Sequence, residues 1–173
     1  MNIWVALRLS SESESKIRCL REDLVDRIPS QFDEETDPHI SVLPGAEIPG
    51  EEYDTLEEKV ENAELPGQKI CVDQLGLYPE DDPFVISLEV SVNLQNLRET
   101  LIRTIRAAGG HIVYQPVTPH ITLFKMADSK QAAESLPEAT VDQLKKTVNQ
   151  QNEDKTAITT WTEDQYQISL HEY

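Results

Sequence analysis

The chain of 173 residues is short of basic residues, and it has no long apolar run. Fifteen lysines and arginines stand against 32 aspartates and glutamates, which leaves a formal net charge of −17. Generic electrostatic binding to nucleic acids needs a basic surface, so the composition argues against it. No apolar run approaches the roughly 20 residues of a membrane span. The early charges at the N-terminus are also unlike a signal peptide. We therefore expect a cytoplasmic protein with no membrane segment.

Cysteines are equally scarce. Cys19 and Cys71 each lie in an apolar pattern, and their spacing is not that of metal ligands. We expect both to be buried free thiols in a reducing compartment.

The acidic charge has two interpretations. Either the surface repels polyanions, or the protein works in a high-salt cytoplasm where an acidic surface keeps it soluble. We favour a halophilic host, because the chain has only 8 lysines and its acids are spread along its whole length. At molar salt the Debye length falls to about 3 Å, so the net charge would barely repel a phosphate held at close range.

Two short stretches repeat one pattern, Pro-His-Ile-hydroxyl-aliphatic. They are Pro38–Val42 and Pro119–Leu123. Successive side chains of a β-strand point to opposite faces. Each copy is therefore predicted to be a strand with an apolar back and a front that carries one imidazole and one hydroxyl. The front of the first strand carries His39 and Ser41, and the front of the second carries His120 and Thr122.

Hydrophobic periodicity predicts the other elements. Strands are expected at 2–9, 69–78, 84–92, 111–114, 156–162 and 165–172, besides the two histidine strands, the first of which should stop at Pro44 and Gly45. Helices are expected from Ser11 to just before Pro29, from Tyr53 to an end at Pro66 and Gly67, from an Asn93 cap to 108, and from a Ser135 cap to 148. Polar loops are expected at 30–37, 79–83 and 149–155. A left-handed turn should follow at Gly109 and Gly110.

The element order is then β-α-β-α-β-β-α-β-α-β-β, and the two histidines lie 81 residues apart. We expect one domain, residues 1–173, built from two pseudo-symmetric lobes that each contain a βαβ unit and contribute one histidine strand. Because the strands alternate like one-sided sheets, the fold class should be α+β with largely antiparallel sheets.

The chemistry of the repeat follows from histidine, whose ordinary pKa lies near neutrality. If the two fronts face each other across a phosphate, one of His39 and His120 can take a proton from an attacking water or ribose hydroxyl. The other can give a proton to the leaving oxygen. Ser41 and Thr122 can hydrogen-bond the non-bridging oxygens, where charge develops. This chemistry requires neither a metal nor another cofactor, and the acids form no cluster with metal-ligand spacing.

The His-Ile-Ser and His-Ile-Thr motifs resemble those of the two-histidine (2H) phosphoesterase superfamily, which includes the 2′-5′ RNA ligases, also called RNA 2′,3′-cyclic phosphodiesterases. The resemblance implies a bilobal fold around a central cleft and metal-independent chemistry. The implied partner is an RNA end or a small cyclic-phosphate nucleotide, whose 2′,3′-cyclic phosphate is opened to a 2′-phosphate, or which is joined reversibly in 2′-5′ linkage. We expect a monomer.

Two positions depart from the family pattern. Where members often carry a phosphate-holding arginine, this chain has Lys125, a point charge rather than a fork. Strict alternation from His120 would also put Lys125 on the opposite face, so it would reach phosphate only if the strand bends. The glycine that members often place after the first motif comes one residue earlier here, at Gly45.

Tyr78 and Tyr114 are candidates for stacking on a base. Packing in a hairpin is the alternative for Tyr78 and for the nearby Phe84.

The remaining candidates have simpler interpretations. His111 is expected to be a surface or capping residue, and His171 an exposed histidine at the sheet edge. Trp4 and Trp161 are expected to pack. Arg8 lies on the polar side of the first strand, where it can face either the cleft or solvent.

A second hypothesis keeps the fold without catalysis. The protein would then be a binding or structural module, for instance in a viral or other assembly. A third hypothesis stays with an enzyme and changes the substrate to a cyclic nucleotide signal or ADP-ribose 1″,2″-cyclic phosphate. Turnover of adenosine 2′,3′-cyclic phosphate in molar KCl separates the enzyme from the idle module.

Overall fold

The computed structural model describes residues 1–34, 37–63, 69–78, 84–114, 118–153, 162–163 and 167–172. Its elements, in chain order, are β1 (Asn2–Arg8), α1 (Ser11–Val25), β2 (Asp33–Glu34), β3 (His39–Glu47), η1 (Gly50–Glu52), α2 (Tyr53–Glu61), β4 (Ile70–Tyr78), β5 (Phe84–Ser91), α3 (Gln95–Ala107), β6 (His111–Tyr114), β7 (His120–Met126), α4 (Ser129–Ser135), α5 (Glu138–Glu153), β8 (Thr162–Glu163) and β9 (Gln167–Glu172).

The strands form one antiparallel sheet in the order β8-β4-β5-β7-β3-β1-β9, with β2 beside β7 and β6 beside β3. This confirms the predicted α+β class. The two histidine strands, β3 and β7, are neighbours at the centre, where Ile40 pairs with Ile121. We call β3, β1 and β9 the first half of the sheet, and β7, β5 and β4 the second half.

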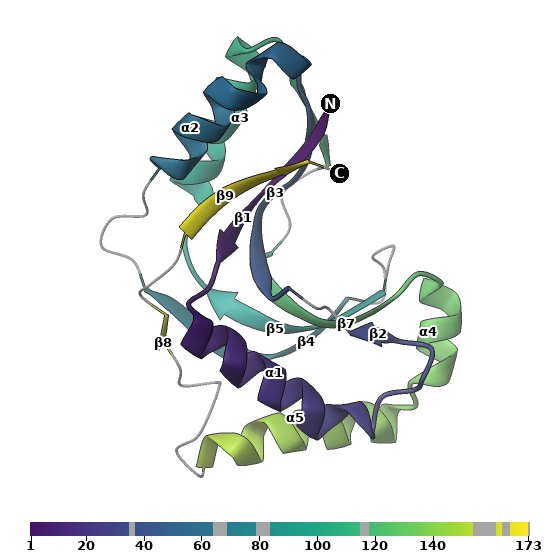
Figure 1. The fold of residues 1–173 in the computed structure, drawn as a ribbon. Helices are drawn as coiled ribbons and strands as arrows, with labels where there is room; N and C mark the ends of the chain where they lie inside the picture. Colours follow the sequence, from purple (N-terminus) through teal and green to yellow (C-terminus); the bar gives the residue numbers. More distant parts are fainter. Residues whose placement is uncertain are drawn as a thin grey trace.

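The helices α1 and α3 each cover the half of the sheet that does not contain the strand before them in the sequence (Figure 1). The helices α2 and α3 lie against the first half, whereas α1 and α5 lie below the second half (Figure 1). Thus α1, which follows β1 in sequence, does not stay with the half that contains β1. None of the helices among the described residues has the length and apolarity that a membrane crossing requires.

The core lies on the back of the sheet, opposite the histidines. Alternate strand residues such as Ile3, Leu7, Ile40 and Ile121 are fully buried there. The helices α1 and α3 contribute apolar residues at intervals of three and four, as their periodicity predicts; these are Ile17, Leu20, Leu24, Leu97, Leu101 and Ile105. The expected left-handed turn after α3 is present, since Gly109 has a φ of 80°.

A β-bulge interrupts each histidine strand at the same place. Both strands share the burial order half-buried, buried, half-buried, buried, buried, half-buried, buried, so two consecutive residues point into the core. In β7 these are Leu123 and Phe124, where the register with β5 shifts by one residue. A bulge resets the alternation. Lys125 therefore lies on the same face as His120 and Thr122, and the expectation from strict alternation was wrong.

The first histidine strand also continues past its expected end. It runs to Glu47, through Pro44 and Gly45. Proline has no N–H and normally disrupts a ladder. In β3, however, Pro44 falls in a register shift between β1 and β3, where it faces no ladder partner. The prediction that Pro44 stops the strand was therefore wrong.

Several element boundaries also differ from expectation. The helix α5 extends to Glu153, through part of the predicted loop at 149–155. An additional helix, α4, is capped by Asp128, whose carboxylate accepts from the Gln131 N–H at 2.9 Å, and it ends at Ser135. Ser135 thus closes one helix instead of opening the next. The N-cap of α1 is Ser10, one residue before the expected position.

The prediction that both cysteines are buried was wrong. Both thiols are free, but Cys19 is exposed on the outer side of α1 and Cys71 is half-buried. Most of the strand expected at 156–162, and with it Trp161, lies outside the described residues.

Candidate functional site: two histidines on neighbouring strands

The two motif histidines are held in the same way. The Nδ1 of His39 lies 2.8 Å from the Asp37 carbonyl, and the Nδ1 of His120 lies 2.8 Å from the Thr118 carbonyl. Because a carbonyl oxygen only accepts, Nδ1 carries the hydrogen in both rings. The neutral rings then have their lone pair on Nε2, the atom that can exchange a proton with a ligand. In each case the carbonyl is two residues upstream, and an intervening proline restricts the backbone.

The two half-buried hydroxyl residues, Ser41 and Thr122, lie on the same face of the sheet as His39 and His120. We call this face the front face.

Behind the first motif, Arg98 on α3 donates to two backbone carbonyls. Its Nε lies 2.8 Å from the Val42 oxygen, and an Nη lies 3.4 Å from the Ser41 oxygen. Burial lowers the pKa of Arg98. This arginine thereby ties α3 to the bulge that follows Ser41. The sequence offered no signal for this contact, because α3 and β3 are far apart in the chain.

Cross-strand partners share a face, so the register defines the front face. In the first half, Arg8 is opposite His39 and Ala6 is opposite Ser41. In the second half, Glu89 is opposite His120 and Ser87 is opposite Thr122. Each motif histidine therefore has a charged residue opposite it on the neighbouring strand. The charge differs, since His39 faces the cation Arg8 and His120 faces the carboxylate of Glu89.

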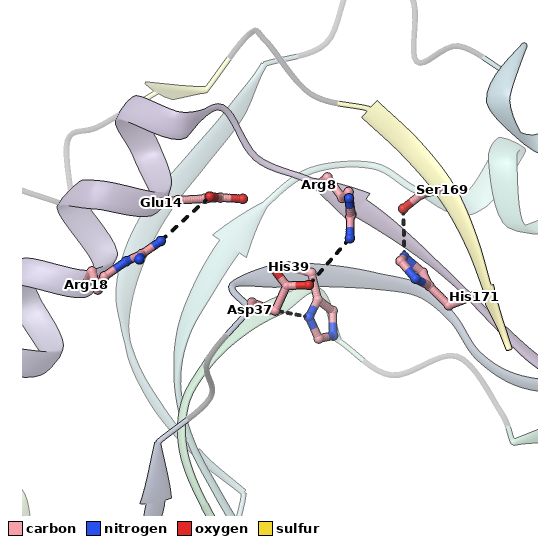
Figure 2. Close-up of polar contacts among 7 residues, drawn as sticks. All are labelled: Arg8, Glu14, Arg18, Asp37, His39, Ser169 and His171. Atoms are coloured by element: carbon pink, nitrogen blue, oxygen red, sulfur yellow. Dashed lines mark hydrogen bonds and ion pairs between the residues drawn. The ribbon is translucent and has the colours of Figure 1, made fainter. Parts of the chain in front are cut away.

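Aromatic rings gather around His39. Its ring centroid lies 4.7 Å from that of Trp4, and Trp4 stacks on His171 at 4.1 Å. Figure 2 shows the polar contacts: Arg8 lies 3.6 Å from the Asp37 carboxylate, and the Ser169 hydroxyl lies 2.8 Å from His171 Nε2. Arg8 thus faces the motif rather than only solvent. His171 is half-buried and engaged, so its prediction as an exposed edge histidine was wrong.

Burial, with the positive charge of Arg8 close by, lowers the pKa of His171 below 6.5. The unfolded chain therefore takes up a proton at this ring at a higher pH than the folded protein does. Linkage then makes the wild type lose stability relative to a His171→Gln variant as the pH falls through 6.5 toward the lower folded-state pKa. Urea unfolding of both proteins between pH 8 and pH 5 measures this difference. A wild type that gains stability relative to the variant at low pH would contradict it.

The second half has a different environment. The ring centroid of Tyr78 lies 4.9 Å from that of His120, so this tyrosine lies at the second motif. Gln74 donates to the Glu89 carboxylate at 2.6 Å. A pocket with a volume of about 320 Å³ opens beside them, lined by Gln74, Leu75, Gly76, Leu77, Glu89 and Lys145. Sequence reasoning missed these residues, since only the strand register places them near His120.

Other predicted residues lie elsewhere. Tyr114, on β6, is 57% exposed. His111 is also exposed on β6, as predicted, with its Nε2 3.3 Å from the Glu47 carboxylate. Among the described residues, no three His, Cys, Asp or Glu side chains group in a way that could hold a metal ion.

The chain is similar to known proteins in its fold. No protein-family model and no curated protein sequence matches the chain. Solved structures do match. The PDE domain of MHV ns2 aligns over 100% of both chains with a TM-score of 0.57 and 14% identity. E. coli LigT complexed with 3′-AMP aligns over 73% of both chains with a TM-score of 0.56 and 19% identity. The chain has the two-histidine phosphoesterase fold.

Usb1 of Kluyveromyces marxianus also matches, over 97% of this chain and 93% of its own, with a TM-score of 0.53 and 12% identity. The family resemblance seen in the motifs is thus confirmed at the level of the two-histidine phosphoesterase fold. In this fold, Lys125 and Pro44 occupy equivalent positions after the two bulges. Only the second half therefore has a cation at that position.

Proposed function

We propose that the protein is a metal-independent phosphodiesterase that opens 2′,3′-cyclic phosphates of RNA ends or small nucleotides. The observation that carries this proposal is the matched pair of imidazoles. His39 and His120 lie on the same face of neighbouring strands, and each is held through Nδ1 by the carbonyl two residues upstream. Two of the matched structures give further support, because one is a complex with 3′-AMP and the other is a PDE domain.

In the proposed reaction, the Nε2 of one neutral histidine takes a proton from water as the water oxygen bonds to phosphorus. The bond from phosphorus to the ribose 3′ oxygen breaks. The other histidine, protonated, gives its proton to that oxygen, so a 2′-phosphate and a free 3′ hydroxyl result. Run in the same direction with the 5′ hydroxyl of a second RNA end in place of water, the same steps would join 2′-5′ ends. Run backwards, they would cleave that linkage and re-form the cyclic phosphate.

The front-face neighbours serve the phosphate. Ser41 and Thr122 follow the histidines by two residues on the same face. Their hydroxyls can donate to the non-bridging oxygens as negative charge develops. Lys125, returned to this face by the bulge, adds one positive charge from the second half. Since the chain carries a net charge of −17, this local cation would offset part of the repulsion of a phosphate.

The test is hydrolysis of adenosine 2′,3′-cyclic phosphate in molar KCl, with product identified by phosphorus NMR. We expect conversion to the 2′-phosphate, and we expect the rate to be unchanged by EDTA because the two histidines supply both proton transfers. Loss of activity on chelation would contradict a metal-independent reaction. Binding of the nucleotide without any turnover would favour the idle binding module instead.

A further inference from the structure

We propose that the pocket beside His120 is a nucleobase site that selects guanine. The inference rests on the proposed function for the position of the phosphate. It concerns the residues Gln74, Glu89 and Lys145, which line the pocket of about 320 Å³ and take no part in the proton transfers. This volume falls within the range of about 300 to 1,000 Å³ that is typical of small-molecule sites.

The pocket lies at the right place for the base of a bound nucleotide. Glu89 is the cross-strand partner of His120, and Gln74 is the cross-strand partner of Glu89. All three therefore lie in one row across the front face, from β7 through β5 to β4. Neighbouring strands are about 4.8 Å apart. A phosphate at His120 and a base near Gln74 would thus be separated by about 10 Å, two strand spacings.

A glycine makes room for the carboxylate in this row. A Cβ at Gly76 would lie 2.8 Å from Glu89 Cγ and 3.0 Å from Glu89 Oε1. The Glu89 side chain therefore occupies the space that any other residue at position 76 would fill. Next along the same face of β4, Tyr78 contacts the ring of His120. The base would lie between this tyrosine and Gln74, against the Glu89 carboxylate that fills the space at Gly76.

The polar groups of the pocket match one base. Gln74 uses one of its two amide N–H groups on Glu89 Oε2, which leaves Glu89 Oε1 and the Gln74 carbonyl as acceptors. Lys145, on α5, adds a donor in addition to the remaining N–H of Gln74. The pocket thus presents the two acceptors that a base with two adjacent N–H groups needs, with donors beside them. Guanine offers two adjacent N–H groups and a carbonyl on its pairing edge, whereas uracil has one N–H, and adenine and cytosine each have a single amino group.

The position beside His39 that corresponds to Glu89 does not offer an acceptor for the N–H groups of a base. There the register places Arg8 where Glu89 stands, and Arg8 lies 3.6 Å from Asp37. The carboxylate of Glu89 has no cation within salt-bridge distance among the described residues. The charge asymmetry therefore assigns the base to the second half, on the His120 side.

The experiment compares kcat/KM for the 2′,3′-cyclic phosphates of guanosine, adenosine, cytidine and uridine. The expected preference for guanosine over uridine is about 10-fold to 100-fold, as for a base read by paired hydrogen bonds. Glu89→Gln and Lys145→Met should each reduce this preference by about tenfold. Lys146→Met, the neighbouring exposed lysine outside the pocket, is the matched control and should keep the preference.

A further variant, Gly76→Ala, tests the pocket without replacing any of its polar residues. Gly76→Ala removes no polar group but would displace the Glu89 carboxylate, so it should lower the guanosine preference as well. Far-UV circular dichroism checks the fold of every variant. Equal kcat/KM for the four nucleotides would overturn the proposal. So would a guanosine preference that survives in Glu89→Gln, Lys145→Met and Gly76→Ala.

Failure of the proposed function would look different, because none of the four nucleotides would then be hydrolysed. Titration with guanosine, which has no phosphate, tests the pocket in that event. Saturable binding that is tighter than for uridine and weakened by Glu89→Gln supports the base site. Absence of guanosine binding, with no turnover of any nucleotide, would overturn both proposals.

Discussion

Replacing His39 or His120 with alanine is expected to lower kcat for cyclic-phosphate hydrolysis by about a hundredfold to ten-thousandfold each. Each variant removes one of the two proton transfers and leaves the other in place. Neither imidazole is part of the buried core, so both variants should fold. The measurement is single-turnover hydrolysis of adenosine 2′,3′-cyclic phosphate, with circular dichroism and urea unfolding as checks on the fold.

The chain offers a matched control for this experiment. His111 is a strand histidine with a polar contact, to Glu47, but it lies exposed on β6. His111→Ala should keep wild-type kcat. Near-normal hydrolysis by either His39→Ala or His120→Ala would show that the role assigned to that histidine is wrong. Equal losses in all three variants would point to a general effect on the protein rather than to proton transfer.

Ile40→Ala is expected to destabilise the protein by about 2 to 5 kcal/mol, the usual cost of truncating a fully buried isoleucine. The position is special because Ile40 and Ile121, both with 0% exposure, form the pair that joins β3 to β7. A cavity there loosens the joint between the two halves of the sheet. The free energy of unfolding in urea measures the loss.

Val113→Ala is the control for this prediction, because Val113 is a strand residue that is 47% exposed. It should change stability by less than about 0.5 kcal/mol. Ile40→Val, which removes a single methylene, should cost about 0.5 to 1.5 kcal/mol. If Ile40→Ala cost no more than Val113→Ala, the two halves would not depend on this contact.

Local pattern was sufficient for much of the fold. Alternation identified β1, β5 and both histidine strands, and periods of three and four residues identified α1, α2 and α3. These signals are readable because one face of each element is buried in a continuous core. Boundaries were less well predicted. The extent of β3 past Pro44 depended on a register shift, and α4 had no apolar periodicity long enough to reveal it.

The neighbours of each histidine could not be predicted in the same way. The charge opposite His39 is Arg8 and that opposite His120 is Glu89, and both pairings depend on strand register. Register is set by hydrogen bonds between segments that are distant in sequence. The exchange of α1 and α3 between the two halves is likewise a result of packing (Figure 1).

Alternation within the two motifs was enough to predict two Pro-His-Ile-hydroxyl strands, each with an imidazole and a hydroxyl on one face and an apolar back. These properties follow from the two-residue period of a strand and need no partner. The folded chain was needed to learn that the strands are neighbours, that a bulge returns Lys125 to the front face, and that a polar pocket opens beside His120. Those properties arise from pairing between distant segments, which alternation along a single strand does not encode.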